Sequence, residues 1–268
     1  KDFADAHKLV TNIQKKGGDE LIRIKADHAI LVAPSGAGKG VGVIIPTLLS
    51  YPGPVFVTDI KGENYAVTRR AREAKGRKVI AFDPFGITDA SRIRINPLQF
   101  LDASSKDIVD DVQTIAELIC PNHEKVGTTA EFFQSQASNI VKCFILYAIC
   151  NLPKDERNLY TIYRLLSKPQ NELLELLGEI GQDRSIAFEE AANLANSFFS
   201  TASEERSGIL NTARMEMRFL GSPYVREAIE ISDVLLSDIV KGELDLFVCI
   251  PPERLSDQKK LLRLMTGI

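Results

Sequence analysis

The sequence predicts an α/β protein in which a parallel sheet is interrupted by a long all-helical insertion. Apolar runs without polar alternation occur at residues 29–32, 55–57 and 79–82, and such runs are typical of strands covered on both faces. Helical segments separate them, which is the βαβ order of a parallel sheet. Helical periodicity replaces the strand pattern from about residue 101, and a strand-like run returns at residues 244–250.

Composition and charge are those of an ordinary globular protein. The 268 residues are 44% hydrophobic and 26% charged, which suits one large or two small domains. The net charge of −3 does not favour nucleic-acid binding over the whole surface, although it is compatible with a local basic channel. Neither a signal peptide nor a run of about 18 apolar residues occurs. Because the chain opens at Lys1 rather than Met, we expect it to be a piece of a longer protein.

The cysteines and histidines have no spacing typical of a metal site. They are Cys120, Cys143, Cys150 and Cys249, with His7, His28 and His123. The absence of a C-x-x-C pair suits a reducing cytoplasm and argues against a structural metal. We therefore interpret the histidines as incidental. Cys143 and Cys150, seven residues apart on one predicted helix, are interpreted as core-filling residues.

A glycine-rich turn follows the first apolar run and resembles a phosphate-binding loop. The nucleotide-binding residues that we predict are Pro34, Ser35, Gly36, Ala37, Gly38, Lys39, Gly40 and Val41. Glycines let successive N–H groups point at an anion, and the following helix adds its positive end. Lys39 would reach the β- and γ-phosphates. The alternative is a plain strand-to-helix turn with a solvated lysine.

The loop departs from the pattern G-x-x-x-x-G-K-[ST] at both ends. Ala33 replaces the first glycine, and Gly40 replaces the hydroxyl residue that binds Mg²⁺. The next segment, residues 41–50, is a poor helix by propensity. Pro46 cannot donate to the Gly42 carbonyl, so we expect it to bend or delay this helix.

Two aspartates end the next two predicted strands. Asp59 follows the run at residues 55–57, and Asp83 follows the run at residues 79–82. Ligands of parallel sheets bind at the carboxyl ends of the strands. We therefore expect Lys39, Asp59 and Asp83 to lie along one edge of the sheet.

The segment between these strands is strongly basic. Its cations are Arg69, Arg70, Arg72, Lys75, Arg77 and Lys78, opposed by Glu73. They are interpreted either as contacts to a nucleic-acid backbone or, as we favour, as the solvated face of a crossover helix.

Capping patterns place the helices of the insertion. Ser104 or Ser105 caps a predicted helix that ends at Ile119, and Thr128-x-x-Glu131 is a capping box that opens a helix to about Cys150. Further helices are predicted at residues 171–180, at 222–230 and, after the second capping box Thr201-x-x-Glu204, up to Leu220; a last one runs from about residue 257 to residue 265.

At this point the motifs resemble those of a known family. Residues 33–49 look like the nucleotide loop of type IV secretion coupling proteins, the ATPases that deliver DNA–relaxase complexes or effector proteins to a secretion or conjugation channel. Residues 59–63 resemble the second motif of that family. Residues 82–84, 96–98 and 248–253 follow its pattern and order, so the likeness covers nearly the whole chain.

The resemblance implies a RecA-like P-loop domain with an inserted all-α domain. Residues 1–100 would form the first part of the nucleotide-binding domain, residues 101–230 the insertion, and residues 231–268 the second, truncated part. The cofactors implied are ATP and Mg²⁺. The glycine after the loop lysine is also a family feature, so Gly40 matches it.

The resemblance also implies roles for single residues. Lys39 would be catalytic by neutralising charge on the γ-phosphoryl group. Asp59, Lys61 and Glu63 would lie in the γ-phosphate and Mg²⁺ neighbourhood. An arginine of the next subunit would complete the site, and the sequence leaves Arg69, Arg206, Arg214 and Arg218 open.

Partners and location follow from the family as well. The full-length protein is expected to be a hexamer at the cytoplasmic face of the bacterial inner membrane, anchored by N-terminal transmembrane helices, whereas the present chain would be soluble and monomeric. Secretion-channel ATPases and inner-membrane components would be its partners. The all-α domain would meet effector proteins, adaptors or relaxase–DNA.

One motor element is missing from the sequence. No apolar run ending in Asp-Glu follows Pro252, and Ile60 and Pro84 stand after Asp59 and Asp83 where a glutamate is wanted. We therefore expect the water-activating carboxylates to lie outside this chain.

Three functions stay open: a translocation ATPase, a recruitment module that binds nucleotide without turnover, and a DNA-pumping translocase of the segregation or repair type.

Overall fold

The computed structural model describes residues 30–32, 34, 36–121, 127–183 and 189–268. The chain divides into two compact units, residues 1–51 and residues 52–268.

The first unit contains a helix that changes type along its length. A π-helix, Gly40–Ile44, precedes the α-helix α2, Ile45–Ser50. The N–H of Ile45 donates to the Gly40 carbonyl, five residues back. Pro46 stands in the first turn of α2, where its missing N–H costs least. The sequence predicts that Pro46 bends or delays this helix. The helix is not delayed, since its π-helical part begins at Gly40, but its α-helical part begins only at Ile45.

The predicted buried strand at residues 29–32 is wrong for the residues that the structure describes. Residues 30–32 form no strand, and Ile30 and Val32 are 92% and 88% exposed. Residue 29 lies outside the described part of the chain. A short strand is stable only when a neighbouring strand pairs with it, and residues 30–32 have no such pairing among the described residues.

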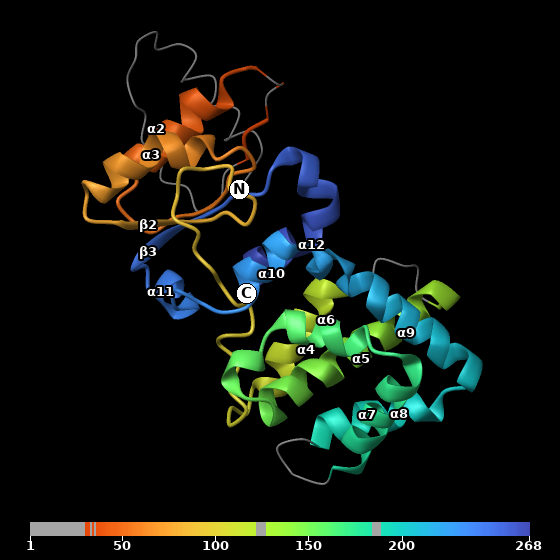
Figure 1. Cartoon of the computed structure of the whole chain (residues 1–268). Helices are drawn as coiled ribbons and strands as arrows, with labels where there is room; N and C mark the ends of the chain where they lie inside the picture. The colour runs from red at the N-terminus through yellow and green to blue at the C-terminus, as the bar shows by residue number, and fades with distance from the viewer. Residues whose placement is uncertain (1–29, 33, 35, 122–126, 184–188) are drawn as a thin grey trace, which may run out of the picture. The chain divides into compact units, whose positions relative to one another are not determined.

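The second unit carries a three-stranded parallel sheet in the order β1-β3-β2. The strands are β1, Phe56–Thr58, β2, Lys78–Phe82, and β3, Leu244–Val248. Phe82 pairs with Val248, which pairs with Thr58 on its other side. The predicted strands at residues 55–57, 79–82 and 244–250 are thus confirmed, together with their parallel direction. Figure 1 shows β2 beside β3, although the two strands lie far apart in the sequence.

The helix α3, Glu63–Glu73, crosses from β1 to β2 and leaves the place between them for β3. All residues of β3 are buried. Tyr65 of α3 meets Phe247 of β3 edge to face, with ring centroids 5.6 Å apart. An apolar contact therefore fixes α3 on the central strand.

Helices, and no strand among the residues that the structure describes, occupy the chain between β2 and β3. They are α4, Ile108–Ile119; α5, Thr129–Asn151; α6, Leu159–Leu166; α7, Gln170–Gln182; α8, Glu189–Ser200; α9, Ser203–Met217; and α10, Pro223–Ile229, with short 3₁₀ turns at Lys154–Glu156 and Arg218–Gly221. After them come α11, Leu236–Val240, the 3₁₀ turn Pro252–Arg254 beyond β3, and α12, Leu255–Gly267. Figure 1 shows α4 and α9 close to α5.

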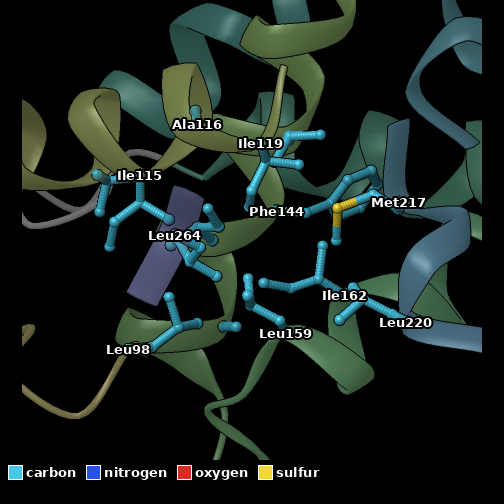
Figure 2. Packing of buried hydrophobic residues seen from close by; sticks show 14 of the residues in the cluster. Leu98, Ile115, Ala116, Ile119, Phe144, Leu159, Ile162, Met217, Leu220 and Leu264 are labelled. Atoms are coloured by element: carbon cyan, nitrogen blue, oxygen red, sulfur yellow. The ribbon is translucent and has the colours of Figure 1, made fainter. Parts of the chain in front are cut away.

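The core of the helical stretch centres on α5. Phe144 is fully buried, and Figure 2 shows it between Ile119 of α4 and Met217 of α9. Leu264 of α12 belongs to the same cluster, so the last helix packs on the helical stretch as well as following the sheet.

The capping predictions have mixed outcomes. Thr128 caps α5, because its Oγ accepts from the Glu131 N–H at 3.1 Å. The box at Thr201 is wrong: α9 begins at Ser203, and the Thr201 hydroxyl instead donates to the Phe198 carbonyl at 2.7 Å. That bond closes the end of α8.

The first helix of the stretch also begins later than predicted. It starts at Ile108, with Asp107 as its N-cap. Ser105 accepts from the N–H of Asp107 at 3.1 Å and shapes the preceding turn. Ser104 is likewise held in a turn, because its N–H and hydroxyl both donate to Asp102.

Candidate functional site

The glycine-rich loop has the backbone that an anion cradle requires. Gly36 and Gly38 have φ of +78° and +79°, the left-handed region that glycine enters without strain. Ala37 between them keeps a negative φ and donates from its N–H to the Pro34 carbonyl at 3.3 Å. Left-handed and right-handed residues alternate in this way in anion-binding nests.

Lys39 stands where the loop enters the helix. It is the N-cap of the π-helix, and its Nζ donates to the Pro34 carbonyl at 2.8 Å. The ammonium is therefore folded back over the start of the loop. Ser35 lies outside the described residues.

The position after the lysine has room for a side chain. A Cβ built at Gly40 meets nothing within 4 Å, and one at Gly38 meets only a Val41 methyl at 3.7 Å. The missing hydroxyl at Gly40 is therefore not a consequence of crowding.

Three side chains stand in a row at the carboxyl edge of the sheet. Asp59, Cys249 and Asp83 follow β1, β3 and β2, and they continue the ladder: the Asp59 N–H donates to the Val248 carbonyl and the Cys249 N–H to the Phe82 carbonyl, both at 2.9 Å. Asp59 and Asp83 thus lie along one edge, as predicted. Lys39 belongs to the other unit, so its place beside them stays a prediction.

Asp59 is buried and holds the start of α3. Its side chain is 3% exposed in the folded chain. One carboxylate oxygen accepts from the Tyr65 N–H at 2.8 Å, and the other accepts from the Asn64 side chain at 3.2 Å. Burial raises the pKa of this carboxyl above its usual value, and the bonds from Tyr65 and Asn64 oppose the shift.

Asp83 is bound more completely than Asp59. It accepts from the N–H groups of Gly86, Ile87 and Thr88, and also from the Thr88 hydroxyl, at 2.7 to 3.1 Å. These four bonds use both carboxylate oxygens, so Asp83 shapes the loop after β2. That loop touches the one after β1, because a Cβ at Gly62, whose φ is +69°, would lie 2.6 Å from a Thr88 methyl.

Lys61 and Glu63 differ from Asp59 in facing solvent. They form a loose ion pair at 3.9 Å, and their side chains are 62% and 72% exposed. Of the three residues that the sequence assigned to the γ-phosphate neighbourhood, these two are accessible to a ligand without rearrangement.

Cys249 lies between the two aspartates, because it follows the central strand. Burial raises the pKa of its thiol to about 12, and the negative charges of Asp59 and Asp83 add to the shift. A thiol in this state is a poor nucleophile, so Cys249 acts as a filler of the edge.

The four arginines that are candidates for completing the nucleotide site of a neighbouring subunit have different surroundings in the structure. Arg206 donates to carbonyls at the end of α8, Arg214 donates to the Leu166 carbonyl at 2.7 Å, and Arg69 lies over the Tyr65 ring. Arg218 is exposed and has no side-chain partner among the described residues.

A buried ionic cluster at the opposite edge of the sheet escaped sequence reasoning. Asp245 of β3 is fully buried and accepts from Arg72 Nε at 2.6 Å and from Arg77 Nη2 at 3.0 Å. Interpreting the whole basic segment as a solvated helix face is therefore wrong for Arg72, whose side chain is 1% exposed. The available signal was an aspartate inside an apolar strand, which requires a buried partner.

No metal-binding group and no membrane-spanning helix appear in the described part of the chain. Within those residues, no cluster of three or more His, Cys, Asp or Glu side chains is arranged to hold a metal ion. None of the described helices has both the length and the apolar character that crossing a bilayer requires.

Comparison with known proteins decides the family. Residues 5–268 match the family described as "Type IV secretory system Conjugative DNA transfer". The chain belongs to this family. The resemblance to type IV secretion coupling proteins is thereby confirmed, and the sheet with its parallel strands confirms the α/β class.

Curated members of this conjugative DNA transfer family are similar over most of the chain. The type IV secretion system-coupling protein VirD4 of Bartonella quintana is 26% identical over 99% of this chain and 42% of its own length. The conjugal transfer protein TraG of Escherichia coli is 27% identical over 90% of this chain and 39% of its own. The VirD4 protein of Agrobacterium fabrum is 28% identical over 92% and 36%. The chain thus spans 36% to 42% of the length of these relatives.

Solved structures of a conjugative coupling protein also align. TrwBdeltaN70, unbound, aligns with a TM-score of 0.45 and 14% identity over 80% of this chain and 49% of that one. TrwB in complex with the ATP analogue ADPNP gives 0.43 and 14% over 80% and 51%.

Proposed function

We propose that this chain is the ATP-binding cytoplasmic part of a type IV secretion coupling ATPase, which recruits a DNA–relaxase complex or an effector protein and drives it to the secretion channel. The observation that carries the proposal is the loop at residues 34–41, with Gly36 and Gly38 in the left-handed region and Lys39 at the start of the helix. Family membership supports it. The full-length protein is proposed to be a RecA-like hexamer at the cytoplasmic face of the inner membrane.

The loop fits a triphosphate by its backbone and by its charge. The N–H groups of residues 35–41 would bind phosphate oxygens, since nests and helix starts both bind anions. Lys39 would exchange the Pro34 carbonyl for a phosphate oxygen, a stronger partner because it is charged. Stabilising charge on a transferred phosphoryl group in this way is typically worth a few kcal/mol.

Mg²⁺ fits the described residues less well. Gly40 offers no hydroxyl, and the oxygens of Asp83 are all bonded to its own loop. Asp59 Oδ1 accepts only the longer hydrogen bond from Asn64, at 3.2 Å. Among the carboxylate oxygens of Asp59 and Asp83, it is therefore the one that could most easily give up its hydrogen bond to bind a metal ion. ATP with Mg²⁺ would supply the phosphoanhydride bond that is hydrolysed. Lys61 and Glu63 would lie beside the γ-phosphate and relay its presence to a neighbouring subunit.

The division of labour along the chain is part of the proposal. Residues 1–100 and 231–268 would form the nucleotide-binding domain, and residues 101–230 the all-α domain that meets cargo or an adaptor. Two hydrogen bonds at the junction support this: the Ile95 N–H donates to the Ala228 carbonyl at 2.8 Å, and the Leu236 N–H to the Gln99 side chain at 3.0 Å. The chain therefore leaves the sheet and returns to it along adjacent segments, as an insertion does.

A second candidate function is a recruitment module that binds nucleotide without turnover. The observation that favours it is the engagement of both strand-end aspartates, Asp59 and Asp83, in bonds to their own loops. Steady-state ATP hydrolysis, with and without single-stranded DNA, separates the two. Hydrolysis by this chain supports the motor, and nucleotide binding without hydrolysis supports the module.

Both candidate functions require nucleotide binding, which is tested by titrating labelled ATP against the chain and its Lys39→Ala variant. Loss of the charge-assisted contact is expected to weaken binding by about tenfold or more. Lys241→Ala, which removes an exposed lysine after α11, is the matched control and should leave the affinity unchanged. Equal affinity of the wild type and Lys39→Ala would contradict the proposal.

A further inference from the structure

The loop that follows β2 contacts the loop that follows β1. We call residues 84–92, the loop after β2, the strap. A Cβ at Gly62, in the loop after β1, would lie 2.6 Å from the methyl of Thr88 in the strap. Arg69 of α3 also pairs with Asp89 of the strap at 3.4 Å. All of these residues belong to the second unit, so the contacts lie within one compact body.

The strap also contacts α10, at the end of the helical stretch. The ring centroids of Phe85 and Tyr224 are 5.8 Å apart. Arg92 Nη1 lies 3.6 Å from Glu227 Oε2. Because α10 packs in turn on α6, the strap connects the carboxyl edge of the sheet with the helical stretch through side-chain contacts.

Hydrogen bonds within the strap make it stiff. The two carboxylate oxygens of Asp83 accept from three of its backbone N–H groups and from the Thr88 hydroxyl. The Ala90 N–H donates to the same hydroxyl at 3.3 Å. Thr88 and Phe85 therefore belong to one cross-bonded turn and are only three residues apart. A displacement of Thr88 is passed on to Phe85, because the turn between them has little freedom to absorb it.

The contact between the strap and α10 leaves room for movement. A cavity of about 70 Å³ lies between them, lined by Asp83, Arg92, Tyr224 and Glu227 together with apolar neighbours. Close packing resists displacement, so α10 can shift toward this cavity with fewer clashes than a fully packed helix. The side chains of Arg92 and Glu227 are 64% and 67% exposed, so their ion pair is weak and hinders such a shift little.

We propose that the strap couples the loop after β1 to α10, so that the nucleotide state of the protein is passed to the helical stretch. Under the proposed function, Lys61 of that loop lies beside the γ-phosphate, and the inference rests on this assignment. ATP and ADP differ in that phosphate, so they hold the loop differently. The loop displaces Thr88, and the strap passes the displacement to Tyr224 of α10. Since such coupling is reciprocal, a partner bound through α10 changes nucleotide affinity in return.

Gly62→Ala tests the coupling without nucleotide. Its new methyl group would collide with the Thr88 methyl. We therefore expect amide hydrogen exchange at residues 223–229, measured by mass spectrometry, to become several-fold faster. Gly76→Ala is the matched control, because Gly76 has φ of +80° but a Cβ there would meet nothing within 4 Å. It imposes similar backbone strain and should leave that exchange unchanged. No effect of Gly62→Ala, or equal effects of the two variants, would overturn the proposal.

Thr88→Ser separates transmission through the strap from a general loss of stability. It removes the methyl group and keeps the hydroxyl that donates to Asp83. When it is combined with Gly62→Ala, we expect exchange at residues 223–229 to return to the wild-type rate. Exchange that stays fast in this double variant would show that the collision with Thr88 is not the cause, and would overturn the proposal.

A nonhydrolysable ATP analogue provides the second arm of the test. On the wild type we expect it to protect residues 34–41 and to change the exchange at residues 223–229, whereas ADP should only protect residues 34–41. Phe85→Ala, which removes the ring that meets Tyr224, should keep the protection and lose the change.

The two arms distinguish failure of the coupling from failure of nucleotide binding. Protection of residues 34–41 without a change at residues 223–229 would overturn the coupling and leave nucleotide binding standing. An analogue that protects nothing would contradict the proposed function, and Gly62→Ala with its controls then decides the coupling alone.

Discussion

Arg94 and Asp233 tie together the two segments through which the chain leaves the sheet and returns to it. Arg94 donates through Nη2 to Asp233 Oδ1 at 2.6 Å and through Nε and the backbone N–H to Oδ2 at 3.0 and 2.9 Å. The Asp233 N–H donates back to the Arg94 carbonyl at 2.9 Å. This clamp fixes the base of the helical stretch where it joins the β-sheet part.

Asp233→Asn is therefore expected to destabilise the chain in a pH-dependent way. The bonds from Arg94 lower the pKa of the Asp233 carboxyl, so the folded state holds the ionised form more strongly than the unfolded state does. The difference in unfolding free energy between the wild type and the variant should be largest at neutral pH. It should shrink as the pH falls through the ordinary pKa of aspartate, about 4, and below. Urea unfolding at several pH values measures it. A difference that stays constant down to acid pH would speak against the clamp.

The buried cluster at the other edge of the sheet predicts a larger and simpler effect. Asp245→Ala removes the buried carboxylate that pairs with Arg72 and Arg77, and breaking a buried ion pair by removing one partner costs about 3–5 kcal/mol. The control is Asp89→Ala, which breaks the exposed pair with Arg69 and should cost no more than about 1 kcal/mol. Chemical denaturation compares the two. Similar losses in both variants would show that Asp245 does not hold the sheet.

The contribution of Asp59 to the unfolding free energy is expected to change with pH in the opposite direction from that of Asp233. Burial raises the pKa of its carboxyl, so between the ordinary and the raised pKa the folded state binds more protons than the unfolded state. Its contribution to the unfolding free energy therefore falls as the pH rises through that interval. Asp59→Asn keeps an acceptor for the Tyr65 N–H and removes the fall, so its stability curve should be flatter. Parallel pH curves for the variant and the wild type would exclude this account of Asp59.

Gly40 offers a gain-of-contact experiment. Its Cβ position is open, so Gly40→Ser should fold and place a hydroxyl where phosphate loops bind Mg²⁺. The expected result is a several-fold increase in the Mg²⁺-dependent part of ATP affinity. Gly40→Ala, with the same Cβ and no hydroxyl, is the control and should lack the increase. If both variants behave alike, the hydroxyl does not reach the metal.

The sheet could be predicted from local pattern because its strands read as uninterrupted apolar runs. The burial that this pattern suggests holds along the whole of β3 only, since Phe56 of β1 is 41% exposed. The order of the strands could not be predicted, since nothing local tells that β3 enters between β1 and β2. The same limit hid the contact of Arg72 with Asp245, which lie 173 residues apart in sequence. Tertiary packing, rather than helix propensity, decided those positions.

The candidate site shows the same boundary between local and long-range information. The turn at Gly36 and Gly38 and the start of the α-helical part just before Pro46 are backbone effects of neighbouring residues, so sequence reasoning reached them. The capping box at Thr201 failed because its hydroxyl had a nearer acceptor in α8. The engagement of Asp83 with its own loop depends on side-chain geometry that spacing does not contain.

The most direct test of the central claim is a crystal structure of the chain with a nonhydrolysable ATP analogue and Mg²⁺. The account predicts the phosphates inside the loop at residues 34–41, with Lys39 Nζ moved from the Pro34 carbonyl to a phosphate oxygen. A bound analogue elsewhere on the chain, with the bond from Lys39 to Pro34 intact, would contradict it.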